Sequence, residues 1–128
     1  SDFPDGVSPR VVERMIRKLP ISTSSVLKTF HDSCEPMGAV PYDEIPNFNE
    51  TRLKWGLELL RDGDCRPEFN PGNTFVLASK DDQIVPKEMT SALFAENEIK
   101  WVAEKGHLLP ITGTDVCCEI ILSAISDK

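Results

Sequence analysis

The sequence predicts an α/β chain with parallel strands, and the region 73–107 carries the observations that predict it. Apolar runs at 74–78 and 98–103 have the length and composition of strands. A helix start at 84–88 separates the two runs. Because strand, helix, strand is the order of a βαβ unit, we expect parallel strands joined by a right-handed crossover.

Three amphipathic helices are expected before this unit, and the first begins at Ser8. Ser8 is a candidate N-cap, Pro9 suits the first helical position, and Pro20 stops the helix. Apolar residues at helical spacing form one face of this helix: Val11, Val12, Met15, Ile16 and Leu19.

The second and third helices are expected over about 23–34 and about 50–61. The cluster Ser22–Ser25 caps the second helix, and Asn49 and Gly63 mark the two ends of the third. The residues expected to be buried are Val26, Leu27, Phe30 and Cys34 on the second helix and Leu53, Leu57 and Leu60 on the third.

The remaining segments are a proline-rich loop at 35–48, a return to the core at 64–72, and a closing helix from about Thr114. The closing helix is expected to face the sheet with Val116, Cys117, Ile120, Ile121, Ala124 and Ile125.

A carboxylate and an imidazole follow the two strands. Asp82 lies just past the first strand and His107 just past the second, so parallel strands bring both to the edge where open α/β folds hold ligands. There His107 can act as a general base after the bend at Gly106, and Asp82 can fix its tautomer. Three alternatives stay open: His107 has no task, Asp82 is a solvated or helix-terminal charge, or Asp81 is the acid.

The nucleophile of such a site is missing from the sequence. There is no G-x-S-x-G elbow and no glycine run for an oxyanion hole. Because oxyanion stabilisation alone is worth about 2.7–4 kcal/mol, an acid and a base without these parts have little to activate. We therefore expect that the chain by itself does not hydrolyse esters. Six of the serines before the imidazole are interpreted as caps, helix residues or a strand end: Ser8, Ser22, Ser24, Ser25, Ser33 and Ser79.

Two phrases of the sequence resemble the α/β-hydrolase family. The phrase Asp-x-Ile-Val-Pro at 82–86 follows one strand, and Gly106-His107 follows the next, as at the C-terminal end of that family. More narrowly, the helix at 52–60 is similar to the lid of the pimeloyl-[acyl-carrier protein] methyl ester esterases of biotin synthesis.

The resemblance implies a partial α/β-hydrolase fold, with a helical lid at 1–63 and part of the core at 64–128. It implies a cytoplasmic serine carboxylesterase acting on pimeloyl-acyl-carrier-protein methyl ester, with Asp82 as triad acid and His107 as triad base. It implies no metal and no organic cofactor. The alternative function is a truncated, non-catalytic module that binds an acidic carrier protein or an acyl group.

The first helix has a cationic face that suits an acidic partner. Arg10, Arg14 and Arg17 recur at i, i+4 and i+7 in a chain of net charge −7. In the esterases that the chain resembles, lid arginines engage the acidic acyl carrier protein. The alternative is a solvated face balanced by Glu13, and His31 is interpreted as a surface residue. Four residues either line an acyl channel or pack the lid: Met15, Phe30, Met37 and Trp55.

Composition excludes several classes of function. A net charge of −7 argues against a nucleic-acid partner, and the lack of an apolar run of about 18 residues argues against a membrane span. The four cysteines lack metal-ligand spacing and are expected to be free thiols of a reducing cytosol. Two parallel strands cannot form a sheet buried on both faces, and the chain begins at Ser1. We therefore expect a fragment that can self-associate through an open sheet edge.

Overall fold

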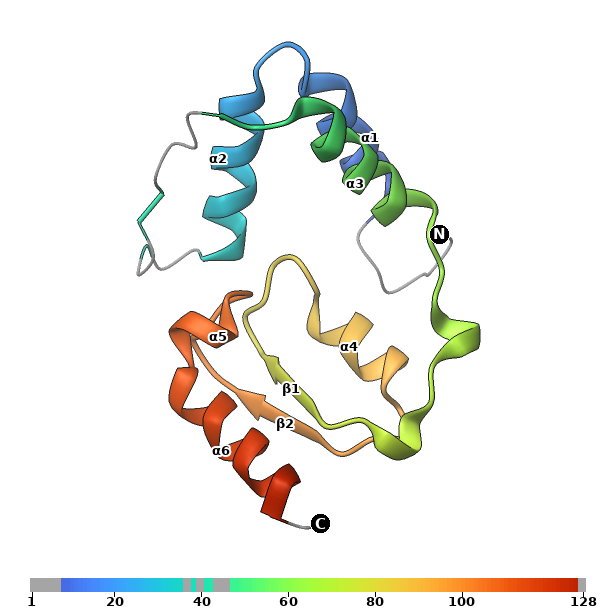
Figure 1. The fold of residues 1–128 in the computed structure, drawn as a ribbon, viewed down its shortest axis with the longest axis vertical. Coiled ribbons are helices and arrows are strands. Elements are labelled where there is room, and N and C mark those ends of the chain that lie inside the picture. Colours follow the sequence, from blue (N-terminus) through green and yellow to red (C-terminus); the bar gives the residue numbers. More distant parts are fainter. Residues whose placement is uncertain (1–7, 36–37, 39–40, 43–46, 127–128) are drawn as a thin grey trace.

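We describe the protein from a computed structural model, which describes residues 8–35, 38, 41–42 and 47–126. The chain combines helix and sheet and is mostly helical, with two parallel strands (Figure 1). Its elements in order are α1 (Pro9–Lys18), α2 (Thr23–Cys34), α3 (Glu50–Asp62), η1 (Arg66–Glu68), η2 (Pro71–Asn73), β1 (Val76–Ser79), α4 (Lys87–Leu93), β2 (Ile99–Val102), α5 (Leu109–Thr112) and α6 (Thr114–Ser126).

The elements form two groups in Figure 1. One group contains α1, α2 and α3, and the other contains β1, β2, α4, α5 and α6. The segment with η1 and η2 connects them along one side. The boundary expected between residues 63 and 64 falls directly after α3.

The three N-terminal helices bury only part of their predicted apolar faces. α1 packs against α2 and α3, and it buries Ile16 and, just past its end, Leu19. Leu60 on α3 is 71% exposed and Phe30 on α2 is also exposed, so the predicted burial of these two is wrong. Val11, on the apolar face of α1, is 46% exposed. Helical spacing places a residue on a face, but burial needs a second layer, and these helices contact mainly one another.

The N-caps of the helices differ in chemistry. Asn49 Oδ1 accepts the backbone N–H three residues later at 3.0 Å, which confirms the predicted cap of α3. Ser8 and Ser22 occupy the N-cap positions of α1 and α2 as predicted, but their side chains make no capping hydrogen bond. Gly63 ends α3 as predicted, with φ of −72° rather than the left-handed value. A Cβ at Gly63 would lie 2.7 Å from the carbonyl oxygen of Leu59, which explains the need for glycine.

The strand–helix–strand unit forms as the sequence predicts. β1 and β2 are parallel, with Val76 opposite Ile99 and Ser79 opposite Val102, and α4 between them in sequence contacts β1. The backbone N–H of Lys80 donates to the carbonyl of Val102 at 2.9 Å, which extends the pairing past the end of β1. The predicted parallel arrangement is confirmed.

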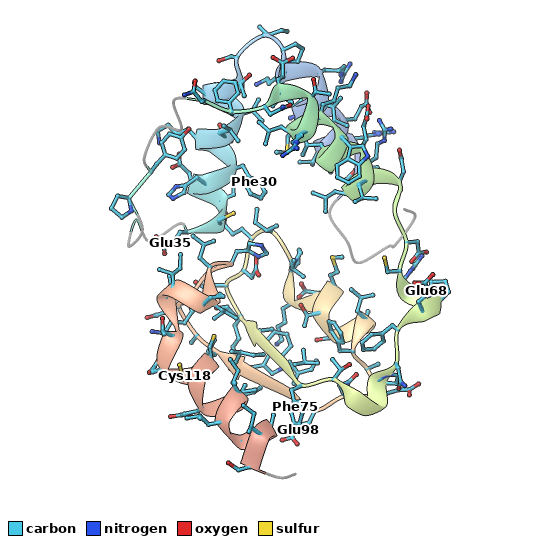
Figure 2. The ribbon with its side chains drawn as sticks, in the orientation of Figure 1. Phe30, Glu35, Glu68, Phe75, Glu98 and Cys118 are labelled. Carbon is cyan, nitrogen blue, oxygen red and sulfur yellow. The ribbon has the colours of Figure 1, made fainter. Side chains whose placement is uncertain are left out.

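The bounds of this unit differ from the prediction at two places. β1 begins two residues later than expected, and Phe75 before it stays 66% exposed (Figure 2). α4 begins at Lys87 rather than at residue 84. The backbone N–H groups of Ile84 and Val85 donate to the side chain of Asp82, so these two residues form a turn instead of the first helical turn.

The C-terminal helix begins at Thr114 as expected and contacts the short helix α5, which the sequence did not predict. Ile121 and Ile125 are exposed, so their predicted contact with the sheet is wrong. A sheet of two strands offers too narrow a surface to cover the whole apolar side of a 13-residue helix. The predicted sheet-facing residues that are half-buried are Val116, Cys117, Ile120 and Ala124.

Most of the proline-rich loop predicted at 35–48 lies outside the described residues, and so does Met37. Within the described part of that segment, Glu35 is buried and Tyr42 is half-buried.

Candidate active site

Asp82 and His107 are in contact at the carboxyl edge of the strand pair. The Nδ1 atom of His107 lies 2.9 Å from Oδ2 of Asp82. Asp82 belongs to the turn after β1, and His107 belongs to the loop after β2, so the parallel pairing of the strands brings them together. The structure therefore has the proximity that the sequence predicts, whereas the catalytic roles of the two residues stay a prediction.

The second oxygen of Asp82 fixes the direction of the carboxylate. Asp82 Oδ1 accepts the backbone N–H groups of Ile84 at 2.8 Å and Val85 at 2.9 Å. Oδ2 is therefore the oxygen that faces the imidazole, and the side chain of Asp82 is only 12% exposed. A carboxylate held in this way can accept a hydrogen bond from Nδ1–H of the imidazole, which leaves Nε2 free for chemistry.

Asp81, the alternative acid, does not contact the imidazole. Its Oδ1 accepts from the hydroxyl of Ser79 and from the backbone N–H groups of Lys105 at 3.2 Å and Gly106 at 3.3 Å. The hydrogen bond from Ser79, followed by those from the two backbone groups, lowers the pKa of Asp81 below its ordinary value. Of the two neighbouring carboxylates, the structure thus pairs Asp82 with His107 and attaches Asp81 to the backbone before His107.

The loop that carries His107 has an unusual backbone. Glu104 and Gly106 have positive φ values of 55° and 60°. The glycine fits the tight bend that the sequence predicts, because residues without a Cβ adopt positive φ without strain. Nothing in the local sequence predicts the left-handed conformation of Glu104, which is uncommon outside glycine.

A contact with α2 also holds His107. Its backbone N–H donates to the carbonyl oxygen of Cys34, the last residue of α2, at 2.7 Å, and its side chain is 33% exposed. The end of a helix from the first group therefore supports the loop of the second group. Sequence reasoning missed this contact, since Cys34 and His107 are far apart in the chain and no local pattern connects them.

The thiol of Cys34 is a poor candidate for the missing nucleophile. Burial raises the pKa of this thiol, and the negative charge of Asp82 raises it further. Because the thiolate is the nucleophilic form, a raised pKa keeps the sulfur unreactive at neutral pH. All four cysteines are free, as the sequence predicts.

We call the contacting pair Asp82 and His107 the dyad. Among the described residues, no hydroxyl nucleophile lies at this dyad. No serine or threonine there is hydrogen-bonded to the imidazole of His107, and the hydroxyl of Ser79 is buried and bonded to Asp81. The hydroxyl of Ser33 donates to a carbonyl of its own helix.

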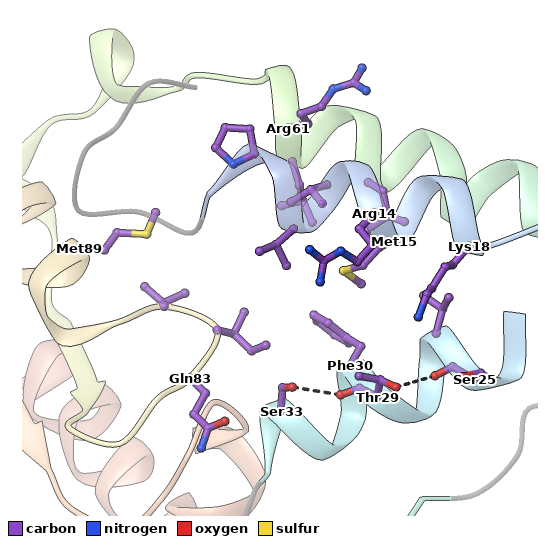
Figure 3. A pocket seen from close by; sticks show the side chains of 18 residues that line it. Arg14, Met15, Lys18, Ser25, Thr29, Phe30, Ser33, Arg61, Gln83 and Met89 are labelled. Atoms are coloured by element: carbon purple, nitrogen blue, oxygen red, sulfur yellow. Dashed lines mark hydrogen bonds between the residues drawn. The ribbon is translucent and has the colours of Figure 1, made fainter. Parts of the chain in front are cut away.

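A cavity of about 520 Å³ lies beside the dyad, lined from α1, α2, α3, the turn at 83–85 and Met89 (Figure 3). Most of its lining is apolar, including Met15 and Phe30, which the sequence suggests as acyl-channel residues. Trp55, suggested for the same channel, is exposed and does not line it. Neither Asp82 nor His107 lines the cavity. The three residues that follow Asp82 do, so the cavity adjoins the dyad without containing it.

The cationic face of α1 is exposed, as predicted. Arg10, Arg14 and Arg17 are all solvent-accessible, and Arg14 also lines the cavity. Glu13, which balances this face in the alternative interpretation, pairs with Arg61 of α3 at 2.6 Å, and Arg61 also pairs with Asp62 at 2.7 Å.

His31 is not the surface residue that the sequence suggests. Its side chain is 22% exposed, and its ring packs edge-on against Tyr42 with the centroids 5.3 Å apart. Both ring nitrogens are buried, and among the described residues neither has a hydrogen-bond partner, although Nδ1 lies 3.8 Å from Oδ1 of Asp32. The aromatic contact comes from the loop after α2, and the helical pattern carries no signal of it.

No family model, curated protein or solved structure matches this chain. Among the described residues, no helix is long and apolar enough to cross a membrane. The same residues contain no cluster of three or more histidine, cysteine or acidic side chains that could hold a metal ion.

Proposed function

We propose that this chain is the lid and C-terminal core of a serine carboxylic-ester hydrolase, with a partial α/β-hydrolase fold. The observation that carries the proposal is the 2.9 Å contact between Asp82 and His107 at the carboxyl edge of two parallel strands. An acid and a base in the family's order, each directly after a strand, are two of the three members of a hydrolytic triad. The nucleophilic serine comes from a segment outside these 128 residues.

In the proposed reaction His107 is the general base and Asp82 orients it. With Nδ1–H donated to Asp82, Nε2 takes the proton of the serine hydroxyl as its oxygen attacks the ester carbonyl. His107 then gives that proton to the departing alcohol, which leaves the acyl group on the serine. Water, activated by the same Nε2, hydrolyses the acyl-enzyme and restores the serine.

The cavity supports a substrate with an acyl chain. Its volume of about 520 Å³ lies within the range of about 300–1,000 Å³ typical of small-molecule sites, and its lining is mainly apolar. Arg14 and Lys18 add positive charge to the lining, and Arg10 and Arg17 extend that charge over α1. We therefore propose pimeloyl-acyl-carrier-protein methyl ester as the substrate, which would place the protein in biotin synthesis. The acidic carrier protein would bind the cationic face.

A second candidate function is a non-catalytic module that binds an acyl group or an acidic carrier protein. It is favoured by the cavity and the cationic face of α1, together with the lack of a hydroxyl bonded to His107 among the described residues. In this case the contact between Asp82 and His107 only stabilises the loop.

Turnover of p-nitrophenyl esters distinguishes the two functions. The chain alone is expected to show none, and turnover is expected after addition of the protein's preceding segment with the serine elbow. His107→Ala then abolishes turnover, and Asp82→Asn lowers it by about 10⁴-fold, the scale known for the wrong imidazole tautomer. His31→Ala is the matched control and keeps the activity. Equal activity of the His107→Ala and His31→Ala variants contradicts the hydrolase. Acyl binding without turnover in any combination supports the binding module.

A further inference from the structure

We propose that Asp81 is a positioning residue for His107. The first carboxylate of the Asp81–Asp82 pair attaches the backbone of the His107 loop to the end of β1, while the second orients the imidazole. This inference rests on the proposed function, because the position of His107 matters for chemistry only if it is the base.

The contacts of Asp81 are concentrated on one oxygen. Asp81 Oδ1 accepts from the hydroxyl of Ser79, from Lys105 N at 3.2 Å and from Gly106 N at 3.3 Å. The hydroxyl oxygen of Ser79 also accepts from Lys105 N, at 3.3 Å. We call these hydrogen bonds of Ser79 and Asp81 to the His107 loop the anchor. Ser79 is the last residue of β1 and is 1% exposed, so the anchor begins at a buried part of the strand.

The backbone of the loop is shaped to bind such a carboxylate. Lys105 and Gly106 offer two successive N–H groups, flanked by the positive φ values of Glu104 and Gly106. Successive N–H groups in a turn of this kind form a concavity that binds anions. Here the anion is the side chain of Asp81. The lowered pKa of Asp81 follows from the same bonds and keeps the carboxylate charged at neutral pH.

The anchor determines where the imidazole lies. His107 follows Gly106 directly, and in the described part of the chain Asp81 and Ser79 supply the hydrogen bonds between its loop and the end of β1, apart from the dyad itself. On the other side, the hydroxyl of Thr112 donates to the carbonyl of Lys105 at 2.6 Å. Without Asp81 the loop keeps its attachments to α2 and α5 and the hydrogen bond from Lys105 N to Ser79, but it loses both backbone hydrogen bonds to the Asp81 carboxylate. The 2.9 Å contact should then loosen.

Nitrogen-15 NMR of the imidazole tests this directly in the full chain. His31→Gln leaves His107 as the one histidine, so long-range ¹H–¹⁵N spectra report its tautomer alone. With Asp81 present, we expect most of His107 to be in the tautomer protonated on Nδ1. Asp82→Asn is expected to reduce the population of this tautomer. Asp81→Ala is expected to reduce it to the same level although Asp82 remains. Asp81→Asn keeps an acceptor oxygen in place and is expected to restore most of it. Asp115→Ala, an exposed carboxylate on α6, is the matched control and leaves the population unchanged.

An Asp81→Ala protein that keeps the Nδ1-protonated tautomer overturns the proposal. The proposal is also overturned if Asp81→Asn has no more of this tautomer than Asp81→Ala. If Asp81→Ala does not fold, Ser79→Ala gives the answer, because it leaves Asp81 but removes the hydroxyl that bonds it. A partial loss of the tautomer in Ser79→Ala supports the anchor, and an unchanged spectrum overturns it.

Failure of the proposed function gives a different result. If the population of the Nδ1-protonated tautomer does not depend on Asp82, the dyad itself is wrong. The amide proton shifts of Lys105 and Gly106 report the anchor independently of the imidazole. They are expected to move in Asp81→Ala and to stay in Asp82→Asn, so the two failures are distinguishable.

Discussion

Asp81 and Asp82 are adjacent and chemically identical, but the turn after β1 directs them to different partners. Asp82 bonds the imidazole and the two backbone groups that follow it, whereas Asp81 bonds Ser79 and the backbone before His107. The partners of each residue, rather than its type, decide its role. Asp82→Asn and Asp81→Asn are therefore expected to act through different parts of the site.

The lowered pKa of Asp81 predicts a dependence of stability on pH. A group whose pKa is lower in the folded chain than its ordinary value of 3.8 stabilises the fold above that value, and this stabilisation is lost as the pH falls through the folded pKa. The difference in urea-unfolding free energy between the wild type and Asp81→Asn is expected to be constant near neutral pH and to shrink below about pH 4. Asp115→Asn, which changes an exposed carboxylate on α6, serves as the control. A wild-type advantage that is as large at pH 2 as at neutral pH would contradict the prediction.

The sequence is sufficient to predict that Asp82 and His107 lie close together, because each follows its strand directly and parallel strands end at one edge. It cannot predict that Cys34 supports His107, or that Tyr42 covers His31, since both contacts join distant segments. It also carries no sign of the left-handed backbone at Glu104. Local patterns identify the carboxylate and the imidazole that meet at the strand edge, and the distant residues that contact them emerge only from the folded chain.

At the scale of the elements, helix ends are predictable where a side chain makes a local bond. Asn49 caps α3 as the sequence indicates. The start of α4 is not predictable in the same way, because the side chain of Asp82 takes the N–H groups of Ile84 and Val85 before the helix can begin. The side chain of Asp82 therefore shifts a helix boundary by about one turn.

The two N-cap residues Asn49 and Ser22 provide a matched test. Asn49→Ala removes the bond to the N–H three residues later and is expected to destabilise the chain by about 1 kcal/mol. Ser22→Ala removes a side chain that makes no capping bond and should change the free energy of unfolding by less than half of that. Chemical denaturation measures both. Equal losses in the two variants would show that the cap of α3 contributes nothing specific.

Gly56 and Gly63 on and after α3 are expected to respond to alanine in opposite directions. A Cβ at Gly56 meets nothing within 4 Å, so Gly56→Ala should stabilise the helix by about 0.5–1 kcal/mol. A Cβ at Gly63 would lie 2.7 Å from a backbone oxygen, and Gly63→Ala should destabilise by about 1–3 kcal/mol because the backbone must move. Thermal unfolding of the pair checks the signs. A stabilising Gly63→Ala would contradict the structure of this helix end.

At the scale of the whole molecule, the elements are predicted better than their burial. The parallel pair and the helices of the first group form as expected, but several large apolar side chains are exposed on α3, on α6 and before β1. A sequence pattern shows which side of a helix is apolar and not whether anything covers it. A parallel sheet is normally covered on both faces, and two strands leave an edge with unpaired backbone groups on each side.

We expect the chain to self-associate through its strand pair. Phe75 is 66% exposed directly before β1, next to an edge that can accept another strand. Phe75→Lys places a charge at this edge and should shift sedimentation-velocity profiles toward the monomer over a range of concentrations. Ile21→Lys is the matched control: Ile21 is 83% exposed between α1 and α2, away from the strands, and its substitution should leave association unchanged. A wild type that is monomeric at every concentration, or two variants that dissociate equally, would exclude the strand edge as the interface.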